Sequence, residues 1–385
     1  MNEALVLVIF LAIAIGWWMG RYGLPSLRFF WQRPRTKEYL RGFTYLINEQ
    51  SDTAVDTFLD QLDVTPNTLE MHIAIGTMLR RKGELDRAIR VHQNLLESQS
   101  LDASELSLAQ LELARDFYSA GILDRVESIL CDMVRDQTSY FKEAMRLLID
   151  VYQDMQQWQD ALDIATQLRR QISSSEETKR LCEAMGHYCC ELAEEAIAKD
   201  LPKEAEDKIQ QALTYYPGCV RASILAASLA CRQGDEASAK LHLYKVADQD
   251  VSLFSEAIDH LSNLTIDEKS VDIVRKAHQA HPSHSNFVYL YNAINQQQGE
   301  EEAQHFLESE VSSRPSLTAL GTYVAHQSFH KTDAEVRGVV RHTLQTIVAR
   351  RDRYICLHCG FRGNQMHWLC PKCKRWGDIR QRHGL

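Results

Sequence analysis

The chain has 385 residues, of which 45% are hydrophobic and 25% are charged, and it contains only 8 Pro and 17 Gly. This composition is ordinary for a folded protein and argues against long disordered stretches. The formal net charge is −9, but basic residues gather near both ends, so the middle is strongly acidic and nucleic acid is not expected as its main ligand.

Residues 4–20 read ALVLVIFLAIAIGWWMG, an uncharged stretch just long enough to span a bilayer as a helix. A cleaved signal peptide is the alternative, but Glu3 precedes the stretch, no Lys or Arg does, and no Ala-x-Ala site follows. We therefore predict a single-pass transmembrane anchor over residues 1–20. Residues 21–36 are predicted to form a basic juxtamembrane linker that suits anionic headgroups and, by the positive-inside rule, places the C-terminal bulk in the cytoplasm.

A helical pattern with short polar breaks occupies residues 37–349, and one phrase recurs in it, as in Gly83-Glu-Leu-Asp-Arg-Ala88. The last residue of this phrase returns every 32 to 44 residues, at Ala54, Ala88, Val126, Ala161, Ala205, Ala239, Val271 and Ala303. The period resembles the tetratricopeptide repeat, a helix-turn-helix unit of about 34 residues. The resemblance implies an all-α superhelix of stacked hairpins, with a generic helical bundle as the alternative.

Several details of the repeats can be predicted. Small residues twelve positions before the anchors should let paired helices approach closely, at Gly76, Ala114, Ala193 and Ala227. Prolines eleven or twelve positions after an anchor should end second helices, at Pro66, Pro217, Pro282 and Pro315. The 44-residue step across Arg169 to Asp200 predicts longer helices or an inserted loop.

Stacked hairpins of this kind present a concave face that binds extended peptides or helices of other proteins. Six aromatic residues are candidates for that face, although core packing is expected for most of them: Tyr152, Trp158, Tyr215, Tyr216, Tyr289 and Tyr291.

Two Cys-x-x-Cys pairs, Cys356/Cys359 and Cys370/Cys373, lie ten residues apart near the end of the chain. Four thiolates at this spacing predict one zinc or rubredoxin-type iron ion as the cofactor of a four-cysteine domain over residues 350–385. Disulfides are the alternative, but six further cysteines without ligand-like spacing favour a reducing compartment.

A closed four-thiolate site has no open position for a substrate, so a structural or redox role is expected. His358 and His367 are expected to face solvent. Four aromatic residues are expected to shield the site: Tyr354, Phe361, Trp368 and Trp376. The basic residues around it are expected to meet the acidic array or the membrane surface before nucleic acid: Arg362, Lys372, Lys374, Arg375, Arg380 and Arg382.

The sequence contains no P-loop, no dinucleotide fingerprint, no nucleophile elbow and no His-Glu-x-x-His motif. Scattered carboxylates, such as Glu300 to Glu302, fit solvated helix faces. No catalytic residue and no catalytic cofactor is therefore predicted, and the chain is not expected to be an enzyme.

The order of anchor, about eight or nine repeats and terminal four-cysteine knuckle resembles the lipopolysaccharide assembly protein B family of Gram-negative bacteria. The stretches ALVLVIFLAIAIGWWMGR, RRKGELDRAIRVHQNLL and YICLHCGFRGNQMHWLCPKCKRWG carry the resemblance, which covers essentially the whole chain. In such proteins the four cysteines hold the metal, so the resemblance implies that role for Cys356, Cys359, Cys370 and Cys373.

The resemblance also implies a location in the cell inner membrane and an adaptor role. The adaptor would promote proteolysis of the deacetylase LpxC by the membrane protease FtsH and coordinate other lipopolysaccharide assembly and regulatory membrane proteins, and so limit lipopolysaccharide synthesis. Two other functions stay open from the residues alone, namely a rubredoxin-like electron carrier on a repeat scaffold and a zinc ribbon that binds nucleic acid.

Overall fold

The computed structural model describes residues 64–314, 316–326 and 352–382, together with Leu11, Ile13, Ala14, Trp17, Gly338 and His342. The predicted anchor, the linker, the first repeat anchor at Ala54, and Pro315 lie wholly or mostly outside these residues. Within the described part of the chain, no helix combines the length and apolar character needed to cross a membrane.

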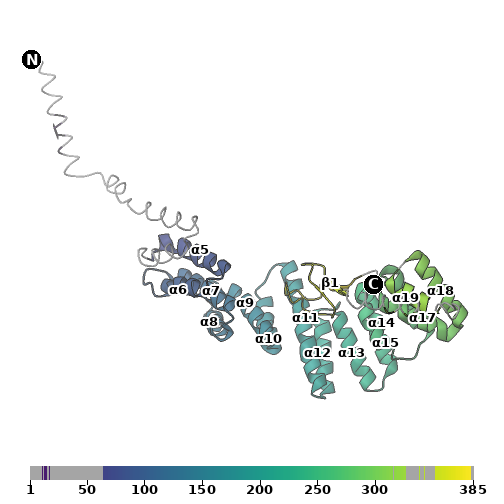
Figure 1. Cartoon of the computed structure of the whole chain (residues 1–385). Helices are drawn as coiled ribbons and strands as arrows, with labels where there is room; N and C mark the ends of the chain where they lie inside the picture. The colour runs from purple at the N-terminus through teal and green to yellow at the C-terminus, as the bar shows by residue number, and fades with distance from the viewer. Residues whose placement is uncertain are drawn as a thin grey trace, which may run out of the picture. The chain divides into compact units, whose positions relative to one another are not determined.

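The chain divides into two compact units, residues 1–141 and 142–385. From residue 64 onward, the described part of the first unit has two helical hairpins (Figure 1), formed by α5 (Pro66–Lys82), α6 (Leu85–Leu96), α7 (Ala103–Ser119) and α8 (Leu123–Arg135). Its helices are held by buried charge as well as by apolar packing. The Arg80 guanidinium of α5 pairs with Asp116 of α7 at 2.6 Å, and the same carboxylate pairs with His92 of α6. One network therefore joins three helices.

The second unit continues the helical hairpins and adds a small sheet (Figure 1). Its helices are α9 (Phe141–Asp154), α10 (Trp158–Arg169), α11 (Ser175–Ala198), α12 (Pro202–Tyr215), α13 (Val220–Arg232), α14 (Glu236–Gln249), the 3-10 turn η1 (Val251–Leu253), α15 (Ser255–Leu261), α16 (Glu268–Ala280), α17 (His284–Gln298), α18 (Glu300–Ser313) and α19 (Leu317–His326). The predicted 44-residue step is explained by α11, which is 24 residues long.

The recurring phrase marks the start of each second helix. Every described anchor is the fourth residue of its helix, at Ala88, Val126, Ala161, Ala205, Ala239, Val271 and Ala303. All except Val271 have no exposed surface. At this position the helix touches its partner, so only a small or β-branched side chain fits at native packing density. The predicted tetratricopeptide-like fold is thus confirmed.

Gly76, Pro217 and Pro282 act as the spacing predicted, whereas Pro66 is the first residue of α5 and the helix that it was expected to end lies outside the described residues. A Cβ atom added to Gly76 would lie 2.4 Å from the His92 ring, so α5 and α6 can meet only because that position lacks a side chain. Pro217 and Pro282 each lie two residues past the end of a second helix, where they prevent its continuation. The turn between the paired helices needs a left-handed residue, which is Gly83 in one hairpin and Gln156 in another.

The aromatic residues mostly lie in the core, as expected. Trp158, Tyr152, Tyr289 and Tyr291 are each buried, and the Tyr289 hydroxyl donates to Ser270 Oγ at 2.9 Å. Tyr215 and Tyr216 are half-buried.

Candidate metal centre

The C-terminal ribbon is a three-stranded antiparallel sheet of very short strands. Its strands are β1 (Tyr354–Cys356), β2 (Arg362–Gly363) and β3 (Ile379–Gln381), in the order β2-β1-β3. Three strands of two or three residues bury little apolar surface, so such a unit requires another source of stability. The four cysteines supply that source at the turns between the strands.

Each Cys-x-x-Cys pair forms a turn with the same backbone hydrogen bonds. In the first knuckle (residues 356–361), the Cys356 amide donates to the Phe361 carbonyl at 2.8 Å, and the Gly360 amide donates to the Cys356 carbonyl at 3.0 Å. In the second knuckle (residues 370–375), the corresponding bonds from Cys370 and Lys374 are both 2.9 Å. The residue after each pair is left-handed, with φ of 71° at Gly360 and 55° at Lys374.

The two knuckles bring the four sulfurs together. Their Sγ atoms all lie within 4.8 Å of one another, with Cys356 to Cys373 at 3.8 Å and Cys359 to Cys370 at 3.6 Å. A tetrahedron with metal–sulfur bonds of about 2.3 Å has edges of about 3.8 Å, so the spacing fits one tetrahedral ion. A disulfide needs sulfurs about 2.0 Å apart, and all ten cysteines are free.

The surroundings of the sulfurs also suit thiolates. Backbone amides of His358 and Cys359 lie at the Cys356 sulfur, and the amide of Arg375 lies at the Cys373 sulfur. Such amides stabilise negative charge on sulfur without adding a ligand. The four cysteines thus form a metal-binding site of a kind that fits zinc or iron. His358 is exposed as expected, whereas His367 is half-buried with its ring edge-on to Phe361.

The four aromatic residues near the cysteines were all expected to shield the metal site, but two of them contact the helical array instead. Tyr354 and Phe361 pack around the cysteine cluster, as expected of shielding residues. Trp368 instead packs against the large core of the helical array, and Trp376 inserts between array aromatics. No local pattern could indicate this division, because the array residues that receive the two rings are distant in the sequence.

Trp376 is the centre of the contact between ribbon and array. Its ring stacks on His187 of α11 at 4.7 Å between centroids with the planes 12° apart, and it meets Tyr188 edge-on at 5.9 Å. Its indole Nε1 donates to Gln153 Oε1 of α9 at 3.0 Å, and the Tyr188 hydroxyl donates to the same oxygen at 3.3 Å. The indole N–H thus has a hydrogen-bond acceptor, and the apolar faces of the ring pack against aromatic side chains.

Charged groups extend the contact along the array. Lys374 pairs with Asp154 of α9 at 2.6 Å, and Arg380 pairs with Asp250, just before η1, at 2.9 Å. The Tyr354 hydroxyl donates to Glu256 of α15 at 3.4 Å. The expectation that basic residues of the ribbon meet the acidic array is therefore confirmed for two of the six named, Lys374 and Arg380.

His187 is a buried array residue that faces the ribbon at this contact. Burial, and then the charge of Arg221, lowers the pKa of His187 to about 3. Its side chain is therefore neutral at physiological pH, which lets the ring lie flat against the Trp376 indole without a buried charge. Nothing in the spacing of the sequence identified His187 as an interface residue.

The described fold defines a class of protein, a tetratricopeptide-like helical array that carries a rubredoxin-like metal ribbon. Residues 354–381 match a family model described as a rubredoxin metal binding domain. The chain is 29% identical over its full length to lipopolysaccharide assembly protein B of Escherichia coli K12, with 99% of that protein covered. It is 28% identical to the protein of the same name from Haemophilus influenzae, covering 99% of this chain and 98% of the relative. The chain is thus a full-length homologue of these proteins, and the resemblance predicted from the sequence is confirmed.

Solved structures also match part of the chain at low identity. One is MamA from Desulfovibrio magneticus, at 13% identity and a TM-score of 0.33, covering 48% of this chain and 97% of that chain. Another is YrrB, described as a tetratricopeptide repeat protein with an unusual peptide-binding site, at 18% identity and a TM-score of 0.32, covering 46% of this chain and 84% of that chain.

Proposed function

We propose that the chain is a non-enzymatic inner-membrane adaptor that limits lipopolysaccharide synthesis. It presents LpxC to the membrane protease FtsH for degradation and coordinates other lipopolysaccharide assembly and regulatory proteins at the same membrane. The observation that carries the proposal is the full-length likeness to proteins named lipopolysaccharide assembly protein B, which includes the first twenty residues as well as the ribbon.

The architecture supports a binding role. A helical array offers long, rigid surfaces for other polypeptides, and the four-thiolate site has no open coordination position for a substrate. The ribbon adds to this platform by docking across α9, α11 and α15. Lys374 and Arg380 are occupied by array carboxylates, which disfavours the alternative of a ribbon that binds nucleic acid.

The anchor proposed for residues 1–20 would give this platform its advantage. A protein held at the bilayer meets membrane partners in two dimensions, which raises their effective concentration without any new contact. The basic residues of 21–36 would keep the linker on the anionic cytoplasmic leaflet and the array in the cytoplasm.

One zinc or iron ion is proposed to be held by Cys356, Cys359, Cys370 and Cys373. Either ion would supply the cross-link that the short strands of the ribbon lack. The surrounding residues hold the ligands in place, because the knuckle amides fix the thiolates and Ile379 packs on Cys356 and Cys370.

The test is LpxC turnover in cells depleted of the protein and then complemented. Full-length protein should restore rapid loss of LpxC and should co-purify with both LpxC and FtsH. A variant without residues 4–20 should bind LpxC but fail to restore its turnover. Unchanged LpxC half-life on depletion would contradict the adaptor role, and full activity of the deletion variant would contradict the need for tethering.

A further inference from the structure

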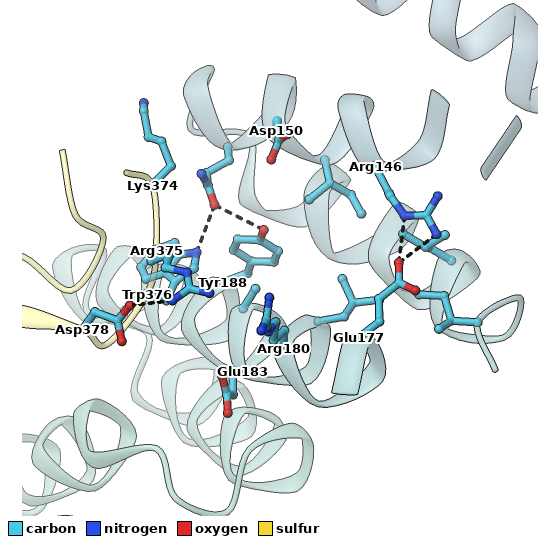
Figure 2. A pocket seen from close by; sticks show the side chains of 16 residues that line it. Arg146, Asp150, Glu177, Arg180, Glu183, Tyr188, Lys374, Arg375, Trp376 and Asp378 are labelled. Atoms are coloured by element: carbon cyan, nitrogen blue, oxygen red, sulfur yellow. Dashed lines mark hydrogen bonds and ion pairs between the residues drawn. The ribbon is translucent and has the colours of Figure 1, made fainter. Parts of the chain in front are cut away.

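A cavity of ≈ 460 Å³ lies where the ribbon meets the array (Figure 2). One wall is made by α9 and α11, with Leu168 of α10 beside them, and the other by residues 374–378 of the ribbon. The cavity is open to solvent and has a volume in the range of ordinary ligand sites. Both the array and the ribbon contribute residues to its lining.

The charged groups around the cavity are unevenly satisfied. All four cationic side chains that line it have a carboxylate partner: Arg146 with Glu177, Arg180 with Glu176, Lys374 with Asp154 and Arg375 with Asp378. Two lining carboxylates, Asp150 and Glu183, make no ion pair and no hydrogen bond within the described part of the chain. The cavity therefore has an excess of unpaired negative charge.

Asp150 is exposed at the mouth of the cavity, yet the nearby walls displace part of its hydration. This loss of hydration, and then repulsion from Asp154, raises the pKa of Asp150 to about 6. The nearby Lys374 opposes this effect only in part, because its ammonium lies 2.6 Å from Asp154. A cation supplied from outside would relieve the repulsion that the protein itself leaves in place.

The positions of the two carboxylates suggest the shape of the ligand. Asp150 lies on α9 and Glu183 on α11, and Figure 2 shows them at opposite edges of the cavity with the Tyr188 ring between them. Apolar groups line the space as well, from Ile149, Leu168 and Leu181. Such walls suit the hydrocarbon stems of Lys and Arg, whose charged heads can then reach the carboxylates.

We propose that this cavity binds a short basic segment of a partner polypeptide, with one Lys or Arg side chain paired to Asp150 and a second paired to Glu183. The inference rests on the proposed adaptor function and deepens it, because it assigns a client contact to one defined site. It also makes the metal ribbon part of the client site, since residues 374–378 form one of its walls.

The test uses full-length protein immobilised in detergent and two pools of nine-residue peptides. The pools are identical except that positions four and six are lysine in one and norleucine in the other. We expect at least tenfold greater retention of the lysine pool. The double variant Asp150→Asn/Glu183→Gln should remove that preference, and each single variant should remove part of it.

A matched control removes two charges elsewhere. Asp163→Asn/Glu195→Gln changes exposed carboxylates of α10 and α11 that do not line the cavity, and it should leave the preference intact. Equal retention of both pools overturns the proposal, as does an equal loss in the control variant, which would reveal only a general attraction to an acidic surface. Removal of the metal by a chelator should abolish the preference, and retention that survives it would place the peptide elsewhere.

Failure of this site is distinguishable from failure of the adaptor function. If the cavity variant loses the peptide preference but still restores LpxC turnover, the site is real and serves another partner. If the variant keeps the preference, the site is wrong whatever the turnover. If turnover is unchanged by depletion of the protein, the adaptor function fails independently of peptide binding.

Discussion

The two metal knuckles share one backbone design but differ in what surrounds them. Both have the same pair of hydrogen bonds, the same ligand spacing and a left-handed residue after the second cysteine. The first exposes its tip, where Leu357 is 69% exposed and His358 also faces solvent. The second includes Lys374, which contacts α9, and is followed by Trp376, which contacts α9 and α11.

This difference separates metal binding from docking. Ligand geometry depends on a few local residues and is therefore repeated in both knuckles. Docking depends on side chains that the two knuckles do not share. Lys374 stands where the first knuckle has Gly360, Trp376 follows the second knuckle, and both have partners on the array. The first knuckle is free to change its tip without changing the fold, whereas the second is constrained by α9 and α11 as well as by the metal.

The largest expected effect comes from removing the cysteines of either knuckle, and it should be the same for both. Cys356→Ser/Cys359→Ser and Cys370→Ser/Cys373→Ser should each lose the metal and unfold the ribbon, because a shared ion stabilises such sites by about 10 kcal/mol or more. Metal content and protease sensitivity of residues 352–382 measure this. The control Cys182→Ser/Cys231→Ser, outside the cluster, should retain the metal. A double variant that keeps one equivalent of metal would refute the ligand assignment.

The next largest effect is on docking, and it should differ between substitutions at the two knuckles. Trp376→Ala removes a half-buried ring that contacts α9 and α11 and should weaken docking by somewhat less than about 3 kcal/mol, the lower end for loss of a fully buried aromatic. Leu357→Ala, at the exposed tip, should change stability by less than about 0.5 kcal/mol. Hydrogen exchange of α9 and α11 in metal-loaded protein reports docking. Similar exchange in both variants would mean that the indole contact does not hold the ribbon.

A smaller effect is the pH dependence of docking, which involves only the second knuckle and its contact with the array. His187 has a pKa of about 3 when it is buried against Trp376, and exposing it would return the pKa toward its ordinary value of 6.5. Below pH 6.5 the undocked form therefore binds a proton that the docked form does not, so docking weakens as pH falls toward 3. At pH 5 the loss is at most about 2 kcal/mol, the value for complete exposure of the ring.

Hydrogen exchange of α11 between pH 5 and 7.5, with metal content checked at each pH, measures this dependence. His187→Phe keeps an aromatic ring against the indole but cannot titrate, so its docking should be nearly independent of pH in that range. A wild-type protein whose docking does not change between pH 5 and 7.5 would show that His187 stays covered on undocking.

The contrast between the knuckles also explains what the sequence could predict. Repeat anchors such as Ala88 and Ala205 can be predicted because each is buried at the same position of its helix in every hairpin. The four metal ligands can be predicted because the spacing within each Cys-x-x-Cys pair is a local pattern. Trp376 was assigned to the metal site, since its partners His187 and Gln153 lie about 190 or more positions away and carry no periodic signal. Long-range complementarity of single side chains leaves no pattern in one sequence.

The smallest expected effect compares the left-handed residues of the two knuckles. Gly360→Ala should cost about 1 kcal/mol, because a side chain disfavours φ of 71° even though no atom lies near the new Cβ. Lys374→Gly removes similar strain but also the partly exposed pair with Asp154, worth less than about 1 kcal/mol, so the two effects should nearly cancel. In an Asp154→Asn background the pair is already lost, and Lys374→Gly should then stabilise the ribbon. The rate of metal release to a chelator should be measured for Gly360→Ala, Lys374→Gly, Asp154→Asn and Asp154→Asn/Lys374→Gly. If Lys374→Gly speeds release in the Asp154→Asn background, the knuckle needs Lys374 for more than this ion pair.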